Sequence, residues 1–95
     1  MGLTLPTFEI TVSGRVQGVG FRAYVVGVAT DMGVTGEVWN TLDQRVSILA
    51  THSDPEALHA FVEALSDGPG RPDFVHAHQS ADRPATARMV IGTTR

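Results

Sequence analysis

Residues 13–22 read Ser-Gly-Arg-Val-Gln-Gly-Val-Gly-Phe-Arg, so that an alternating strand, a glycine-rich turn and a helix start follow one another within a few residues. Gly14, Gly18 and Gly20 allow backbone angles that a β-carbon disfavours, and successive N–H groups can then turn toward one point. The start of a helix adds further unpaired N–H donors. Arg22 carries a planar, permanently charged group that can bind two oxygens at once. The stretch indicates an anion-binding loop, with a tight turn beside an unrelated surface arginine as the alternative.

Composition limits the classes of protein to which the chain can belong. A chain of 95 residues can bury a single core without disulfides or metal, and we expect residues 1–95 to form one domain. The absence of cysteine removes disulfides, zinc-thiolate sites and cysteine nucleophiles. All seven basic residues are arginine and the net charge is -3, which argues against nucleic acid as a partner. Since no apolar run is long enough to span a membrane and no signal peptide is evident, we expect a cytoplasmic protein that does not bind membranes.

The segments on either side of the glycine-rich turn differ in their apolar period. Residues 8–13 alternate apolar and polar side chains, which predicts a half-buried strand. From Phe21 the apolar spacing changes to threes and fours, which predicts a helix that Gly33 ends. Gly27 lies inside this helix, and we expect it to mark a close approach between helix and strand.

The second half of the chain repeats the alternation of strands and helix. Residues 35–40 and 45–50 read as two strands of a hairpin, and Asp54-Pro55-Glu56 is a strong helix start. Gly68-Pro69 ends that helix, and residues 70–72 are predicted to be a loop. Short strands are expected at residues 74–78 and 88–91, separated by a polar segment at 80–86.

This order of elements is typical of one fold. Strand, helix, strand, strand, helix, strand is the ferredoxin-like split βαβ arrangement of the α+β class. It predicts an antiparallel sheet with two helices on one face. Because this fold serves many functions, the function must be argued from the site.

Two motifs resemble those of the acylphosphatase family. Its Gly-x-Val-Gln-Gly-Val-x-Phe-Arg element is met at residues 14–22, and its Gly-x-Val-x-Asn element is met at residues 36–40 on the predicted second strand. The Gly-Pro pair after the second helix also fits, so the resemblance extends over residues 8–91. It implies the same split βαβ fold and hydrolysis of carboxyl-phosphate anhydrides, without a metal or other cofactor.

The resemblance also implies which residues form the site. Arg22 corresponds to the family's phosphate-binding arginine and Asn40 to the asparagine that positions water. The phosphate-binding set, in which backbone N–H groups accompany the Arg22 side chain, is Gln17, Gly18, Val19, Gly20, Phe21 and Arg22. An acyl phosphate is the expected substrate, and inorganic phosphate or sulfate is an expected ligand of the same site.

The chemistry of these residue types is compatible with that assignment. A carboxylate leaves readily, so the main tasks are to neutralise the phosphoryl oxygens and to place a water in line with the bond that breaks. Asn40 can orient a water but is no effective general base, so the water's proton passes to a substrate oxygen. The alternative for Asn40 is a residue chosen for the entry to a turn.

The chain departs from the family pattern on the second strand and in the hairpin turn. Glu37 replaces a common aromatic residue, while Trp39 follows on the same face of the strand. We expect the indole to fill the region of the missing aromatic ring and Glu37 to be exposed. The usual glycine of the hairpin turn is also absent.

Two other interpretations involve residues that the motifs do not specify. His76 and His78 share one face of a predicted strand and could be two metal ligands, although no third ligand is evident. The alternative function is a non-catalytic anion-binding or RNA-binding module, for which Trp39 would be a candidate stacking residue. The acidic charge balance argues against RNA, and we expect a monomer.

Overall fold

Helices and strands follow one another as the sequence predicts. The structure, a computed structural model, describes residues 6–81 and 86–95, so residues 82–85 of the predicted polar segment lie outside the described residues. The elements are β1 (Thr7–Arg15), α1 (Phe21–Met32), β2 (Thr35–Asn40), β3 (Val46–Thr51), α2 (Pro55–Leu65), β4 (Arg71–Gln79) and β5 (Met89–Ile91).

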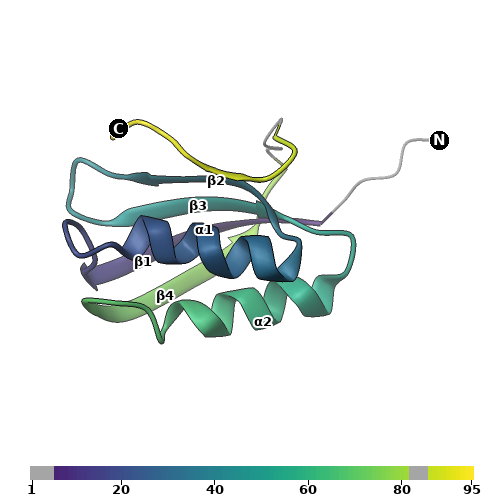
Figure 1. Cartoon of the computed structure of the whole chain (residues 1–95), viewed down its shortest axis with the longest axis horizontal. Coiled ribbons are helices and arrows are strands. Elements are labelled where there is room, and N and C mark those ends of the chain that lie inside the picture. Colours follow the sequence, from purple (N-terminus) through teal and green to yellow (C-terminus); the bar gives the residue numbers. More distant parts are fainter. Residues whose placement is uncertain (1–5, 82–85) are drawn as a thin grey trace.

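The strands form one sheet with the order β4-β1-β3-β2-β5 (Figure 1). β1 pairs antiparallel with both β3 and β4, and β2 pairs antiparallel with β3. The expectation of a wholly antiparallel sheet is wrong for β5, which pairs parallel with β2 from Gly36 opposite Met89 to Val38 opposite Ile91. β4 and β5 therefore lie at opposite edges of the sheet. The predicted α+β split βαβ fold is otherwise confirmed.

Both helices cover the same face of the sheet, as predicted (Figure 1). The alternation of β1 places Ile10 and Val12 on that face, where both are fully buried. Burial of a side chain of this size stabilises the fold by about 1.5–3 kcal/mol relative to exposure. The core lies between sheet and helices and contains Ile10, Val12, Val16, Phe21, Val25, Ala29, Val34, Val38, Val46, Ile48, Ala50, Leu58, Phe61, Leu65 and Met89.

The predicted end of α1 and the predicted start of α2 are confirmed, whereas α2 ends at Leu65, before the predicted stop at Gly68-Pro69. Gly33 adopts a left-handed conformation (φ 71°) after α1, and its N–H lies within bonding distance of the carbonyls of the last turn. At the start of α2 the Asp54 carboxylate accepts a hydrogen bond from the N–H of Glu56. Pro55 occupies the first turn, where its missing N–H removes no helical hydrogen bond.

Two local expectations are wrong. Residues 71 and 72 belong to β4 instead of a loop, because a register shift between Ser13 and Gly14 lets β1 pair with β4 as far as Arg15 opposite Arg71. Gly27 marks no close approach, since a Cβ built there would meet no atom within 4 Å and the residue is exposed.

Candidate active site

The glycine loop, residues 16–20, joins β1 to α1. Gly18 and Gly20 have φ angles of 73° and 82°, and a Cβ at either residue would point into open space. Glycine is therefore required by the backbone conformation and not by crowding. Gly20 caps α1 without a side-chain hydrogen bond, so no capping side chain takes up the first N–H groups of the helix. A loop of this kind followed by a helix start favours an anion.

A cavity of about 160 Å³ lies at this loop and extends to the first turn of α1. Four residues of the predicted phosphate-binding set line it, namely Gly18, Gly20, Phe21 and Arg22. Gln17 and Val19 are not among its lining residues. Ile91 of β5 also lines the cavity and was not identified from the sequence, because nothing in the sequence predicted a parallel strand beside α1.

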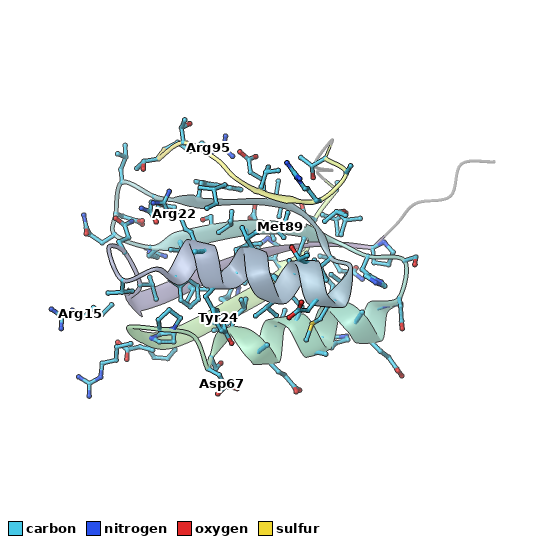
Figure 2. The ribbon with its side chains drawn as sticks, in the orientation of Figure 1. Arg15, Arg22, Tyr24, Asp67, Met89 and Arg95 are labelled. Carbon is cyan, nitrogen blue, oxygen red and sulfur yellow. The ribbon has the colours of Figure 1, made fainter. Side chains whose placement is uncertain are left out.

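The two arginines near the glycine loop differ in position. Arg22 lies in the first turn of α1, is half-buried, and makes no side-chain hydrogen bond or ion pair within residues 6–81 and 86–95. Its cationic group is thus available to an anion in the cavity that it lines. Arg15 is exposed, and Figure 2 shows it extending away from the body of the molecule. It does not line the cavity at the loop, so the structure does not support a contribution from Arg15 there.

The Gln17 side chain links the glycine loop to the β2–β3 hairpin. Its Nε2 amide donates to the carbonyl oxygens of Thr41 and Arg45, each at 2.8 Å. The loop and the hairpin lie at the same end of the molecule (Figure 1). Both carbonyls also accept backbone hydrogen bonds within the turn, Thr41 from the N–H of Gln44 at 3.3 Å and Arg45 from the N–H of Thr41 at 2.9 Å. The pair of bonds from Gln17 therefore adds a direct link between the glycine loop and a turn that is already hydrogen-bonded.

Asn40 is the last residue of β2 and directly precedes Thr41. Strand alternation places it on the helix-covered side of the sheet, with the buried residues Gly36 and Val38. Its Oδ1 atom is buried and has no hydrogen-bond partner among the described residues. A buried acceptor without a donor lowers the stability of a fold by about 1–3 kcal/mol, so the presence of Asn40 at this position needs an explanation. Asn40 does not line the cavity itself, and its chain neighbour Thr41 is the residue that Gln17 contacts.

The hairpin turn compensates for its missing glycine with side-chain hydrogen bonds. Gln44 adopts a left-handed conformation with φ 74°, which is energetically unfavourable for residues other than glycine. The Thr41 hydroxyl accepts from the N–H of Arg45 at 2.9 Å and donates to the Asp43 carboxylate. This hydrogen bond, more than the nearby charge of Arg45, lowers the pKa of Asp43.

Glu37 and Trp39 lie on the uncovered face of the sheet, away from Asn40. The expectation that Glu37 is exposed is only partly correct, since its side chain is 28% exposed and pairs with Arg95 at 2.9 Å. The Arg95 guanidinium also lies 4.1 Å from the centre of the Trp39 ring. The Arg95 N–H donates to the carbonyl oxygen of Asn40 at 3.0 Å. The sequence offered no spacing from which these contacts of Arg95 could be predicted.

His76 and His78 are exposed on the uncovered face of β4, with ring centres 5.8 Å apart. His78 Nε2 lies 3.2 Å from the carboxylate of Glu9 on the neighbouring strand. Within residues 6–81 and 86–95 there is no group of three or more side chains suited to hold a metal ion. The part of the chain that the structure describes also contains no helix that could span a membrane.

Comparison with known proteins identifies relatives over nearly the whole chain. The family model of acylphosphatase matches residues 8–90. The acylphosphatase of Halorhodospira halophila is 43% identical over 93 residues, which are 97% of this chain and 100% of that protein. The acylphosphatase of Lactococcus lactis is 49% identical over 53 residues, so this alignment spans about half of each chain, 56% and 55%. The crystal structure of acylphosphatase from Bacillus subtilis has a TM-score of 0.83 at 36% identity and covers 92% of this chain and 98% of that chain.

Both sequence motifs fall within the residues that the family model matches. The similar solved structure agrees with the observed order of strands and helices, which supports the sequence resemblance at the level of the fold. These findings favour a hydrolase over the alternative of a non-catalytic anion-binding or RNA-binding module. The chain therefore belongs to the acylphosphatase family.

Proposed function

We propose that the chain, as an acylphosphatase, hydrolyses the carboxyl-phosphate bond of acyl phosphates by in-line attack of water and without a metal ion. The backbone N–H groups of residues 17–21 and the Arg22 side chain bind the phosphoryl group. Asn40 positions the water. The products are a carboxylate and inorganic phosphate, and the substrate is a small molecule.

Binding of the phosphoryl group rests on charge and preorganisation. The N–H groups of the loop are fixed before substrate arrives, so little reorganisation is needed as charge develops on the phosphoryl oxygens. Arg22 adds a full positive charge beside these donors and can bind two oxygens. The carboxylate leaves without strong acid assistance, so the site needs no acidic residue opposite the leaving group.

Positioning of water rests on the amide of Asn40. Its buried Oδ1 has no donor in the described residues, and a water that approaches the phosphorus would offer one O–H to this acceptor. The other proton passes to a phosphoryl or carboxylate oxygen of the substrate, since an amide does not take up a proton at neutral pH. Orientation of the nucleophile relative to the phosphorus is the contribution that the reaction requires.

The observation that carries the proposal is the pair of hydrogen bonds from Gln17. A phosphate binder needs only the glycine loop, whereas a hydrolase also needs a water held at a fixed distance from the bound phosphoryl group. The Gln17 amide lies 2.8 Å from the carbonyl oxygens of Thr41 and Arg45, which follow Asn40 in the hairpin. The same residue thus belongs to the phosphate-binding loop and restrains the segment that carries Asn40.

Release of phosphate from acetyl phosphate in the presence of EDTA tests the proposal. We expect turnover that EDTA does not reduce and that inorganic phosphate inhibits. Folded protein that releases no phosphate would contradict the hydrolase function. Activity that EDTA abolishes and Mg²⁺ restores would contradict only the absence of a metal.

We also propose that the chain acts as a single-domain monomer in the cytoplasm. Sedimentation should then give a mass near the 10.1 kDa of one chain, and unfolding in urea should be a single transition. Fractionation of cells followed by immunoblotting would test the location. A dimer, two unfolding transitions or recovery in a membrane or exported fraction would each contradict the corresponding part.

A further inference from the structure

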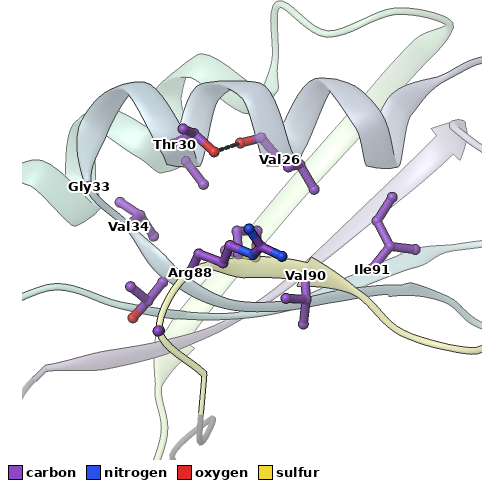
Figure 3. A pocket seen from close by; sticks show the side chains of 11 residues that line it. Val26, Thr30, Gly33, Val34, Arg88, Val90 and Ile91 are labelled. Atoms are coloured by element: carbon purple, nitrogen blue, oxygen red, sulfur yellow. Dashed lines mark hydrogen bonds between the residues drawn. The ribbon is translucent and has the colours of Figure 1, made fainter.

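A groove of about 610 Å³ lies between α1 and β5, outside the residues that the proposed reaction uses (Figure 3). Its walls are mainly apolar, from Val26 and Ala29 of α1, Val34 of the following turn, and Met89 and Ile91 of β5. Sites for small molecules are usually concave and mostly apolar, with few polar groups that fix the orientation of the ligand. Ile91 is 50% exposed, so a ligand in the groove could contact its side chain.

The groove and the cavity at the glycine loop share a lining residue. Ile91 lines both spaces, and Figure 3 shows its side chain at the end of the groove nearer the start of α1. Along α1, Arg22 and Ala23 line the cavity, and Val26 lines the groove one turn later. A group that extends from the phosphoryl site along α1 and past Ile91 would therefore reach the groove.

Arg88 supplies the one charged side chain among the lining residues of the groove. Figure 3 shows the side chain extending over the groove from the start of β5. It makes no side-chain hydrogen bond or ion pair with any residue that the structure describes. An apolar wall with a guanidinium that has no partner among the described residues suits a ligand that has an apolar chain and a terminal anion.

We propose that this groove binds the acyl group of the substrate, with the apolar chain between α1 and β5 and a distal carboxylate at Arg88. The inference rests on the proposed function and specifies its substrate class: acyl phosphates of medium-length dicarboxylic acids. A rise of about 1.5 Å per helical residue separates Ala23 from Thr30 by roughly 10 Å along α1. An extended eight-carbon chain is about that long.

Three substrates with the same reacting bond test the proposal: acetyl phosphate, octanoyl phosphate and the monophosphate of octanedioic acid. We expect kcat/KM for octanoyl phosphate to exceed that for acetyl phosphate by about tenfold, since apolar surface is buried in an open groove. The distal carboxylate should add about threefold to fivefold, because Arg88 is exposed to solvent.

Two variants separate the apolar wall from the charge. Thr30→Trp places a bulky side chain in the groove and should abolish the advantage of both long substrates over acetyl phosphate. Asp31→Trp adds the same bulk on the next residue, which does not line the groove, and should keep the wild-type ratios. Arg88→Gln should remove only the advantage of the dicarboxylic substrate over octanoyl phosphate.

The ratios of kcat/KM among the three substrates, measured with the wild-type protein, test the proposal even if a variant does not fold. Equal kcat/KM for acetyl and octanoyl phosphate would overturn the assignment of the groove. The role of Arg88 would be overturned if kcat/KM for the dicarboxylic substrate did not exceed that for octanoyl phosphate. It would also be overturned if this advantage persisted in Arg88→Gln. Failure to hydrolyse even acetyl phosphate is a different result and would count against the proposed function itself.

Discussion

The Nε2 atom of Gln17 lies 2.8 Å from the carbonyl oxygen of Thr41, and this contact joins the glycine loop to the residue that follows Asn40. A second bond of the same length to Arg45 spans the base of the hairpin turn. The ends of the two hairpin strands are thereby linked to the start of the glycine loop. Gln17 thus adds a direct link between the two halves of the proposed site to the pairing of β1 with β3.

Gln17→Leu removes both donors while leaving the backbone N–H groups of the loop in place. We expect kcat to fall about tenfold, because a misplaced nucleophile costs more than the lost bonds. The free energy of unfolding should fall by only about 1–2 kcal/mol. Steady-state kinetics and urea unfolding measure the two quantities. Gln79→Leu makes the same change at an exposed position of β4 and should alter neither, while a wild-type kcat for Gln17→Leu would contradict the link.

Gln44→Gly should stabilise the hairpin turn. Gln44 has φ 74°, a conformation that costs an ordinary residue about 1–2 kcal/mol, while glycine loses about 0.5–1 kcal/mol through its greater freedom in the unfolded chain. The net gain in unfolding free energy is the difference between these two ranges, about 0–1.5 kcal/mol and centred on about 0.8 kcal/mol, and it is measured as a higher urea midpoint. Leu42→Gly in the same turn, where φ is not positive, should lower the midpoint. A lower midpoint for Gln44→Gly would contradict the argument.

Gly27→Ala should stabilise α1 by about 0.5–1 kcal/mol, since alanine is the better helix former and the added Cβ meets no atom within 4 Å. Thermal unfolding checks this as a rise in Tm. Gly33→Ala provides the matched control, because Gly33 ends the same helix with φ 71° and the substitution there should lower Tm. A loss of stability in Gly27→Ala would show that the helix approaches a neighbour at this position.

Arg95 should stabilise the uncovered face of the sheet through Glu37 and Trp39. Its ion pair and its contact with the indole predict a loss of about 1 kcal/mol in Arg95→Ala. A double-mutant cycle with Glu37→Gln should give a coupling energy of about 0.5 kcal/mol. Unfolding in urea at low and high salt is the measurement, and the coupling should shrink as salt rises. If the two substitutions changed the unfolding free energy by strictly additive amounts at low salt, the predicted coupling between Arg95 and Glu37 would be wrong.

The sequence predicts the fold and much of the candidate site because each relevant signal is local. Positive φ angles demand glycine at positions 18 and 20, and the change of apolar period at Phe21 marks the start of a helix. The parallel pairing of β5 has no local signal, since a three-residue strand gains its partner only from the tertiary fold. For the same reason the cavity contact of Ile91 and the ion pair of Arg95 were not foreseen. Gly27 was misinterpreted because sequence alone does not distinguish an exposed glycine from one beside a strand.

The central claim is that phosphate binding and water positioning belong to different residues. The most direct test measures both phosphate affinity and turnover in the variants Arg22→Ala and Asn40→Ala. Asn40→Ala should bind inorganic phosphate within about threefold of wild type and lose about a hundredfold or more in kcat, because only the nucleophile loses its contact. Arg22→Ala should lose both phosphate binding and turnover. Wild-type turnover in Asn40→Ala, or wild-type phosphate affinity in Arg22→Ala, would contradict the account.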